Sequence, residues 1–410
     1  MGLWFIFIVG FRKFFLIRLV TVLAQFILCL FILSHRTLQK MRKYIVGGWN
    51  RDRLMGIEPH DKDYVLVGCT PADIQKMLDA GYELKGKDFP VYIAPNGEEH
   101  ALARTERKAG SGYTGFEVNV SGVTLEQDLA RRDLTINAIA WDNVVKRYID
   151  PYGGQKDIEN KVLRHVSDAF AEDPLRVLRL ARFGARFSTF KVHSSTLKLV
   201  KKMVSSGELN DLTPERVTVE FVKSSENKFS KFISYLNEFG ALETILPGYV
   251  LNKSVLEGLK FIEENCTPIY SFDMLMTHLL RKQEFSADYC TGMLKLPGST
   301  VRFIQKINKI ESSVLKFRSL SALQMVDLFN VIAARSNGGE EYLVKLLEYF
   351  VLNRNIDSVQ EGLIFQVYDA YRNTKIPDIQ KMVQDGELKS EHIHEYLNSI
   401  RAKSISELFV

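Results

Sequence analysis

Between residues 44 and 150 the apolar residues come in short runs that are separated by polar turns and by one helical stretch. The runs at 44–46, 64–67, 91–94 and 100–103 are rich in Val, Ile, Tyr, Leu and Ala and have the length of β-strands. Pro71 to Ala80 has a helical pattern, with Thr70 placed as its N-cap. This alternation predicts a small α/β domain.

After Pro151 the pattern changes, because apolar residues now recur every three or four positions. Residues 177–187, 197–204 and 342–350 show this helical periodicity clearly, and no internal repeat or low-complexity tract interrupts it. We therefore predict an α+β protein. Its expected parts are an N-terminal extension at 1–40, an α/β domain at 41–150, a first helical region at 151–220 and a second at 221–410.

The extension has two possible explanations. Phe14 to Leu33 is nearly all apolar and about as long as a membrane-spanning helix, but Arg18 and Gln25 interrupt it and basic residues flank both sides. Alternatively, translation begins at Met41, which lies directly before the first strand. No A-x-A cleavage site follows, which argues against a signal peptide. We favour an artefactual or dispensable extension and a cytoplasmic location over a membrane anchor.

Composition narrows the class of protein without deciding its function. The 410 residues are 46% hydrophobic and 25% charged, as in ordinary globular proteins, which argues against a large disordered region. The net charge of +5 is mild evidence for a polyanionic partner, and local basic clusters matter more than the total. The four cysteines are widely separated without a C-x-x-C pair, so neither a disulfide framework nor a zinc site is indicated.

An acidic pair precedes the second predicted strand. Asp61 and Asp63 stand at the head of the apolar run 64–67. In an extended chain, residues i and i+2 project from the same face, so both carboxylates can reach one point. Hard cations such as Mg²⁺ prefer such oxygen ligands, and metals held there would align a nucleoside triphosphate. The alternative is an ordinary turn with solvated acids.

A glycine pair lies shortly before the acidic pair. Gly47 and Gly48 would let the backbone approach a phosphate closely, and Arg51 could add a charge-assisted contact. Alone, paired glycines are often only a loop. In the order strand, glycine turn, helix and acidic strand, the two motifs together favour a catalytic site for nucleotidyl transfer.

Two further segments could contact the same substrate. Arg132 lies just before an apolar stretch and could reach a triphosphate, while Asp133 could instead cap a helix, and these interpretations are compatible. The glycine-rich residues 109–115, which follow basic residues, suit a mobile flap near a phosphate and equally suit an ordinary hairpin loop.

The stretch from Glu172 to Phe183 suggests how a base could be selected. Asp173 precedes Pro174 as a helix cap would, and the arginines that follow it at steps of three share one helix face with it. A carboxylate that accepts from an exocyclic amino group, beside a guanidinium that donates to a ring nitrogen, would accept C and A and reject U and G. The alternative is a solvated charged stripe.

With these motifs in place, the sequence closely resembles the bacterial CCA-adding enzymes, the class II tRNA nucleotidyltransferases, and in particular their multifunctional proteobacterial type. The dense part of the match runs from about Met41 to about Tyr249. The matching stretches, in chain order, are residues 46–52, 61–63, 86–91, 101–108, 131–138, 149–152, 163–166, 172–176 and 212–216.

The resemblance implies a polymerase-β-like head, a neck helix that selects C and A, and a helical body and tail that hold the acceptor arm of tRNA. It implies CTP and ATP as substrates, Mg²⁺ as cofactor and no protein partner. Carried over position by position, the functional residues are Asp61 and Asp63 for Mg²⁺ and catalysis, Gly48, Arg51 and Arg132 for the triphosphate, and Asp173, Arg176, Arg179 and Arg182 for the incoming nucleotide. Glu99 is a candidate third acidic group beside the metal pair.

Two departures from the family pattern bear on activity. Trp49 and Asn50 stand where the family has a small residue and a valine, which leaves a catalytically inactive tRNA-binding relative as an alternative. A poly(A) polymerase is a second alternative, because the resemblance implies that it shares the head and neck and differs in the nucleotides it accepts. The multifunctional relatives also have a His-Asp phosphohydrolase site, but here Leu279 follows His278. We therefore predict that phosphohydrolase activity is absent.

Overall fold

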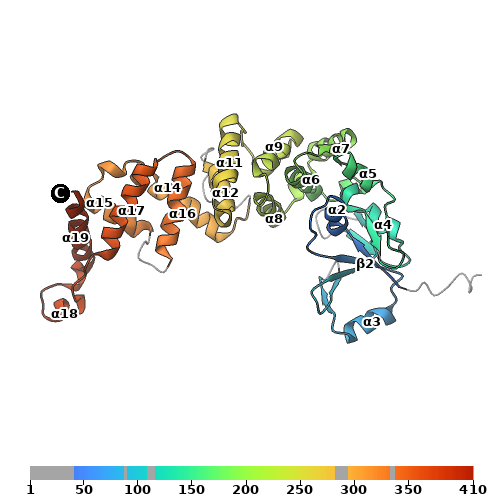
Figure 1. The fold of residues 1–410 in the computed structure, drawn as a ribbon, viewed down its shortest axis with the longest axis horizontal. Coiled ribbons are helices and arrows are strands. Elements are labelled where there is room, and N and C mark those ends of the chain that lie inside the picture. The colour runs from blue at the N-terminus through green and yellow to red at the C-terminus, as the bar shows by residue number, and fades with distance from the viewer. Residues whose placement is uncertain (1–40, 87–89, 109–115, 282–293, 333–337, 410) are drawn as a thin grey trace, which may run out of the picture. The chain divides into compact units, whose positions relative to one another are not determined.

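A computed structural model describes residues 41–86, 90–108, 116–281, 294–332 and 338–409 (Figure 1). The chain divides into two compact units. Within the described ranges, the first unit holds residues 41–108, 116–132 and 136–155, and the second holds 133–135 and 156–409. The predicted α+β class is confirmed, with a mixed α/β head followed by a mostly helical remainder.

A seven-stranded sheet forms the centre of the first unit, in the order β3-β4-β5-β2-β1-β8-β9. Its strands are β1 (Arg42–Val46), β2 (Asp63–Val67), β3 (Glu83–Lys85), β4 (Val91–Ile93), β5 (Glu99–Leu102), β8 (Ala140–Asp142) and β9 (Arg147–Ile149). Neighbouring strands are antiparallel except β2 and β5, which are parallel. The four strands expected from the sequence fall on β1, β2, β4 and β5. The strands β6 (Thr105–Lys108) and β7 (Phe116–Asn119) pair separately.

Three helices accompany the sheet: α2 (Gly48–Leu54), α3 (Pro71–Asp79) and α4 (Leu125–Ala130). Thr70 caps α3 as predicted, because its side chain accepts from the Asp73 backbone N–H while the Asp73 carboxylate accepts in return. Met77 of α3 packs with Leu66 and Tyr92 of the sheet in one apolar cluster. The helix therefore covers one face of β2 and β4.

The second unit includes most of α5 (Gly154–Glu159), because the boundary between the units falls after Gln155. It also includes the 3₁₀ turn η2 (Asp168–Glu172) and two short parallel strands, β10 (Val162–Leu163) and β11 (Lys191–Val192). Its further helices are α6 (Leu175–Arg186), α7 (Ser194–Ser205), α8 (Pro214–Ser225), α9 (Phe229–Phe239), α10 (Ala241–Ile245), α11 (Lys253–Asn265), α12 (Ser271–Arg281), α14 (Gly298–Leu315), α15 (Ala322–Ile332), α16 (Gly339–Leu352), α17 (Ser358–Asn373), α18 (Ile379–Gln384) and α19 (Ile393–Ser406). The three periodic segments of the sequence analysis lie on α6, α7 and α16.

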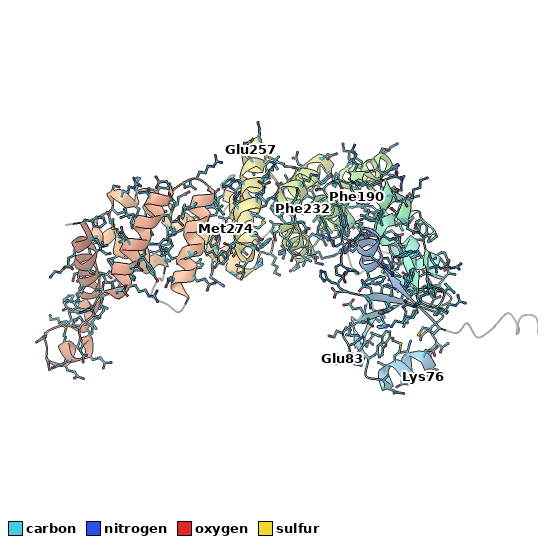
Figure 2. The ribbon with its side chains drawn as sticks, in the orientation of Figure 1. Lys76, Glu83, Phe190, Phe232, Glu257 and Met274 are labelled. Atoms are coloured by element: carbon cyan, nitrogen blue, oxygen red, sulfur yellow. The ribbon has the colours of Figure 1, made fainter. Side chains whose placement is uncertain are left out.

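Aromatic side chains fill the core of this unit around α6, α8 and α9. The rings of Phe221 and Phe232 meet edge to face with centroids 5.1 Å apart, and both side chains are fully buried. Phe232 and, on α12, Met274 lie inside the helical packing, whereas Glu257 of α11 points outward (Figure 2). The amphipathic pattern of each helix thus sets which face is buried.

No helix within the described part of the chain is long and apolar enough to cross a membrane. The candidate span at residues 14–33 lies outside the described residues, as does the glycine-rich segment 109–115.

Candidate nucleotide-binding and catalytic site

Acidic side chains gather where β2 begins. Asp63 is the first residue of β2 and is in register with Glu99, the first residue of the parallel strand β5, so the two side chains lie on the same face of the sheet. Asp61 lies two residues earlier, exposed, in the segment that leads into the strand. Burial raises the pKa of Asp63, and the charges of Glu99 and Asp61 raise it further, against the opposing effect of Arg132.

Asp61 and Asp63 offer the oxygen ligands that a divalent cation prefers. Because Glu99 and Asp61 disfavour the charged form of Asp63, a bound cation would relieve their repulsion. Within the described ranges, no group of three or more His, Cys, Asp or Glu side chains is arranged so that it could hold a metal ion. Mg²⁺ does not require such a group, since it binds through one or two carboxylates, substrate phosphates and water.

The glycine turn lies beside this acidic group. Gly47 has a φ of 74°, a left-handed conformation that favours glycine. A Cβ atom at this position would lie 3.3 Å from Nη1 of Arg132 and 3.9 Å from Oδ2 of Asp63. The turn, Arg132 and Asp63 therefore converge, and glycine keeps the space between them open.

Arg51 is a buried residue under the same turn, only 4% exposed. Its Nε donates to Oδ1 of Asp52 at 2.8 Å, and its Nη1 donates to Oδ1 of Asn137 at 2.7 Å. A Cβ on Gly48 would lie 3.3 Å from Nη2 of Arg51. The guanidinium is thus fixed directly against Gly48, where it adds positive charge beneath the turn.

Arg132 is held by a residue that the sequence analysis missed. Asp128 of α4, which is fully buried, accepts from Nη2 of Arg132 at 3.2 Å and from Nη2 of Arg131 at 2.8 Å. Although burial opposes ionisation, these two guanidiniums keep the pKa of Asp128 below its usual range. The sequence does carry a signal for this contact, because Asp128 stands three residues before Arg131 and four before Arg132, which is the spacing of neighbours on a helix.

The second group of candidates lies on α6 and directly before its first turn. Oδ1 of Asp173 accepts from the Leu175 backbone N–H at 3.1 Å, as expected of a residue at a helix start. Both oxygens of Asp173 also accept from Nη2 of Arg216, at 3.1 Å and 3.0 Å. Arg176, 9% exposed, donates through Nη1 to the Ala169 carbonyl at 2.6 Å. The first two members of the predicted face are therefore fixed by contacts within their own unit.

The other two arginines on this face form ion pairs with buried acids. Arg179 donates to Oδ2 of Asp133 through Nη2 at 2.6 Å, and Arg182 donates to Oε2 of Glu220 through Nε at 2.6 Å. The Asp133 charge raises the pKa of Arg179 above its ordinary value. Oδ1 of Asp133 accepts from the Leu134 backbone N–H, and its other oxygen serves Arg179. The face is thus an ordered, partly buried array, and it differs from a solvated stripe.

His278, which stands where the multifunctional relatives have their His-Asp pair, lies on α12 and is 4% exposed. Its Nδ1 is 2.6 Å from Oδ1 of Asn353. This contact joins α12 to the end of α16, which is a structural role.

Comparison with known proteins identifies the family. Residues 43–164 match the poly A polymerase head domain, and residues 189–251 match a domain described as the probable RNA and SrmB-binding site of polymerase A. A multifunctional CCA protein of Vibrio parahaemolyticus is 56% identical over 212 residues, which are 50% of this chain and 51% of that protein. The chain thus matches about half the length of such relatives.

Other relatives match over nearly the whole chain. A CCA-adding enzyme of Coxiella burnetii is 36% identical over 381 residues, which are 92% of this chain and 98% of that enzyme. The fold is similar to that of a CCA-adding enzyme solved with CTP, at 25% identity, a TM-score of 0.65, and coverage of 89% and 87% of the two chains. It is also similar to the Thermotoga maritima CCA-adding enzyme solved with tRNA, at 24% identity, a TM-score of 0.65, and coverage of 89% and 87%. The chain therefore belongs to the family of CCA-adding enzymes.

Proposed function

We propose that this chain is a nucleotidyltransferase that builds or repairs the 3′-terminal CCA of tRNA from CTP and ATP, in the cytoplasm. The observation that carries this proposal is the convergence of the acidic group at Asp63, the glycine turn at Gly47 and the guanidinium of Arg132 in one unit. A polymerase-type reaction needs these three features: ligands for a cation, space for a triphosphate and a charge to hold it.

The reaction assigned to the first unit is attack of the tRNA 3′ hydroxyl on the α-phosphate. A bond forms between the hydroxyl oxygen and the α-phosphorus. The bond between the α-phosphorus and the oxygen that bridges it to the β-phosphorus breaks, and pyrophosphate is released. Mg²⁺ held by Asp61 and Asp63 would favour ionisation of the hydroxyl and offset the charge of the leaving group. Glu99 is the candidate third carboxylate, and Arg132 would bind the triphosphate at the glycine turn.

Selection of the base is assigned to the α6 face of the second unit. The Asp173 carboxylate would accept from the exocyclic amino group of C or A, and Arg176 would donate to the ring nitrogen. Arg216 and the Ala169 carbonyl support this role, because they fix the directions of these two side chains before a nucleotide arrives. Arg179 and Arg182, paired with buried acids, would keep the face rigid.

Recognition of tRNA is expected to rest on phosphates and shape, because the enzyme must accept every tRNA. The second unit offers suitable cations, for example Lys198, Lys201 and Lys202, which are exposed on α7. The acceptor arm is the part of tRNA that such a surface would hold.

A nucleotide-addition assay tests the proposal. Purified protein is incubated with Mg²⁺ and a tRNA lacking its last three residues, with CTP and ATP supplied separately and then together. We expect two C residues with CTP, and A only after them, with no product from Asp61→Ala. Addition of A alone would establish a poly(A) polymerase instead. Binding of tRNA without any addition, unaltered by Asp61→Ala, would establish an inactive relative.

A further inference from the structure

The two residues that depart from the family pattern, Trp49 and Asn50, lie in α2 directly after the glycine turn. A helix of seven residues has little stability of its own, so tertiary contacts must set its direction. The direction of α2 in turn sets where Gly47 and Gly48 present their backbone groups. The contacts of α2 are therefore relevant to the site, even where they do not touch substrate.

Asn50 makes two of these contacts. Its side chain is fully buried, and its Nδ2 donates to the Ile45 carbonyl in β1 and to the Ile139 carbonyl just before β8, both at 2.8 Å. One amide thus ties α2 to two adjacent segments of the sheet. A valine at this position would fill a similar volume but could not donate to either carbonyl.

Two more contacts hold α2 on the same stretch of chain. Arg51 donates to Oδ1 of Asn137, as described above. The guanidinium of Arg53 contacts two indole rings, with its Cζ 5.1 Å from the ring centre of Trp49 and 4.8 Å from that of Trp141. The ring of Trp49 therefore packs with the side chain one helical turn later.

Three of these four contacts reach every second residue of one short segment. Residues 137, 139 and 141 bind Arg51, Asn50 and Arg53 respectively. We call these contacts the α2 clamp. We propose that Asn50 is a positioning residue that fixes the glycine turn for the nucleoside triphosphate, and that Arg53, in contact with the rings of Trp49 and Trp141, completes the α2 clamp. This inference rests on the proposed function.

The chemistry explains how two unusual residues can occur together. Asn50 replaces apolar packing with two directed hydrogen bonds, and Trp49 supplies the ring on which Arg53 stacks. Displacement of a binding group by about 1 Å can cost roughly a hundredfold in rate, so an inaccurate turn would affect function while the unit still folds. The clamp acts on nucleotide binding and leaves the tRNA-binding surface unchanged.

The test compares nucleotide binding with tRNA binding in the same variants. Dissociation constants for CTP with Mg²⁺ and for tRNA are measured by calorimetry, and folding is checked by circular dichroism. Asn50→Val is expected to weaken CTP binding about tenfold or more, which is the cost of losing one hydrogen bond to a charged phosphate at the displaced turn. Its tRNA affinity should stay within twofold of the wild type. Asn160→Val is the matched control, because Asn160 also donates to a backbone carbonyl but is exposed and outside α2.

A second pair of variants keeps the proposal falsifiable if Asn50→Val does not fold. Arg53 is exposed, so Arg53→Met should fold and should weaken CTP binding, as should Trp141→Leu, whereas Trp141→Phe retains a ring and should restore most of the affinity. Wild-type CTP affinity in folded Asn50→Val, or in both Arg53→Met and Trp141→Leu, overturns the proposal. If the wild type binds CTP but adds none to tRNA, the proposed function is wrong. The effect of the α2 clamp on CTP affinity can still be measured in that case, because it needs binding and no turnover.

Discussion

The packing of α6 against α9 gives a sharp prediction, because it depends on a single glycine. A Cβ atom on Gly184 would lie 2.5 Å from Cε2 of Tyr235 and 2.9 Å from both Cδ2 and Cζ of the same ring. In α17, by contrast, a Cβ on the exposed Gly362 would meet nothing within 4 Å. The same substitution, glycine to alanine, should therefore have opposite effects in the two helices.

The magnitudes follow from two terms. Alanine is favoured over glycine inside a helix by about 1 kcal/mol, so Gly362→Ala should increase the free energy of unfolding by about that amount. At Gly184 the overpacking cost is at the upper end of its range, about 3 kcal/mol, which leaves a net loss of about 2 kcal/mol. For a unit of this size, Gly184→Ala should lower the melting temperature by roughly 4–8 °C, and Gly362→Ala should raise it by roughly 2–4 °C.

The assay is urea and thermal unfolding of the two variants beside the wild type. Gly184→Ala should also relax the proposed preference for C and A, since Arg176 lies in α6 and Asp173 directly precedes this helix. Adding Tyr235→Leu should recover part of the lost stability, because the ring that meets the new methyl group is gone. If Gly184→Ala is as stable as Gly362→Ala, the close packing of α6 on α9 is refuted.

Three further predictions concern charged groups. The pKa of Asp63 is raised by burial and then by Glu99, so the folded protein binds the proton of this carboxyl more tightly than the unfolded chain does. The folded protein therefore loses stability as the pH rises from the pKa of Asp63 in the unfolded chain to its higher value in the folded protein. Asp63→Asn should raise the melting temperature at neutral pH without metal, and Mg²⁺ should stabilise the wild type but not the variant. Glu220 is 2% exposed, and Glu220→Leu should lower the free energy of unfolding by about 3–5 kcal/mol in urea titrations, because Arg182 is left without its carboxylate; an unchanged midpoint would contradict this. Asp173→Asn should reduce the preference for C over U at least tenfold, as measured by competing incorporation, and an unchanged ratio would remove Asp173 from base selection.

The sequence predicted those parts of the fold and site that depend on local spacing. A short apolar run predicts the strand at Tyr64, the position of Thr70 before Pro71 predicts a helix cap, and apolar residues every three or four positions predict α6. The structure confirms all three predictions. The acidic pair and the glycine turn were found for the same reason. Their roles toward metal and nucleotide stay predictions.

Pairings between distant residues were beyond the sequence. Arg182 and Glu220 are 38 residues apart, and Arg179 and Asp133 are 46 apart, so no local pattern connects them. From the sequence alone, Asn50 is only a departure from the family pattern, because its hydrogen bond to Ile139 spans 89 residues. Tertiary structure decides whether a charged or amide side chain is solvated, paired or used as a tie.

The central claim is that one protein, without a nucleic acid template, adds C, C and then A through the carboxylates of Asp61 and Asp63. The most direct measurement is sequencing of the 3′ ends of a tRNA lacking CCA, after incubation with the protein, Mg²⁺ and all four nucleoside triphosphates. The account predicts ends that read CCA and stop there, and unextended ends with Asp63→Asn. Runs of A, or wild-type protein that leaves every end unextended, would contradict it.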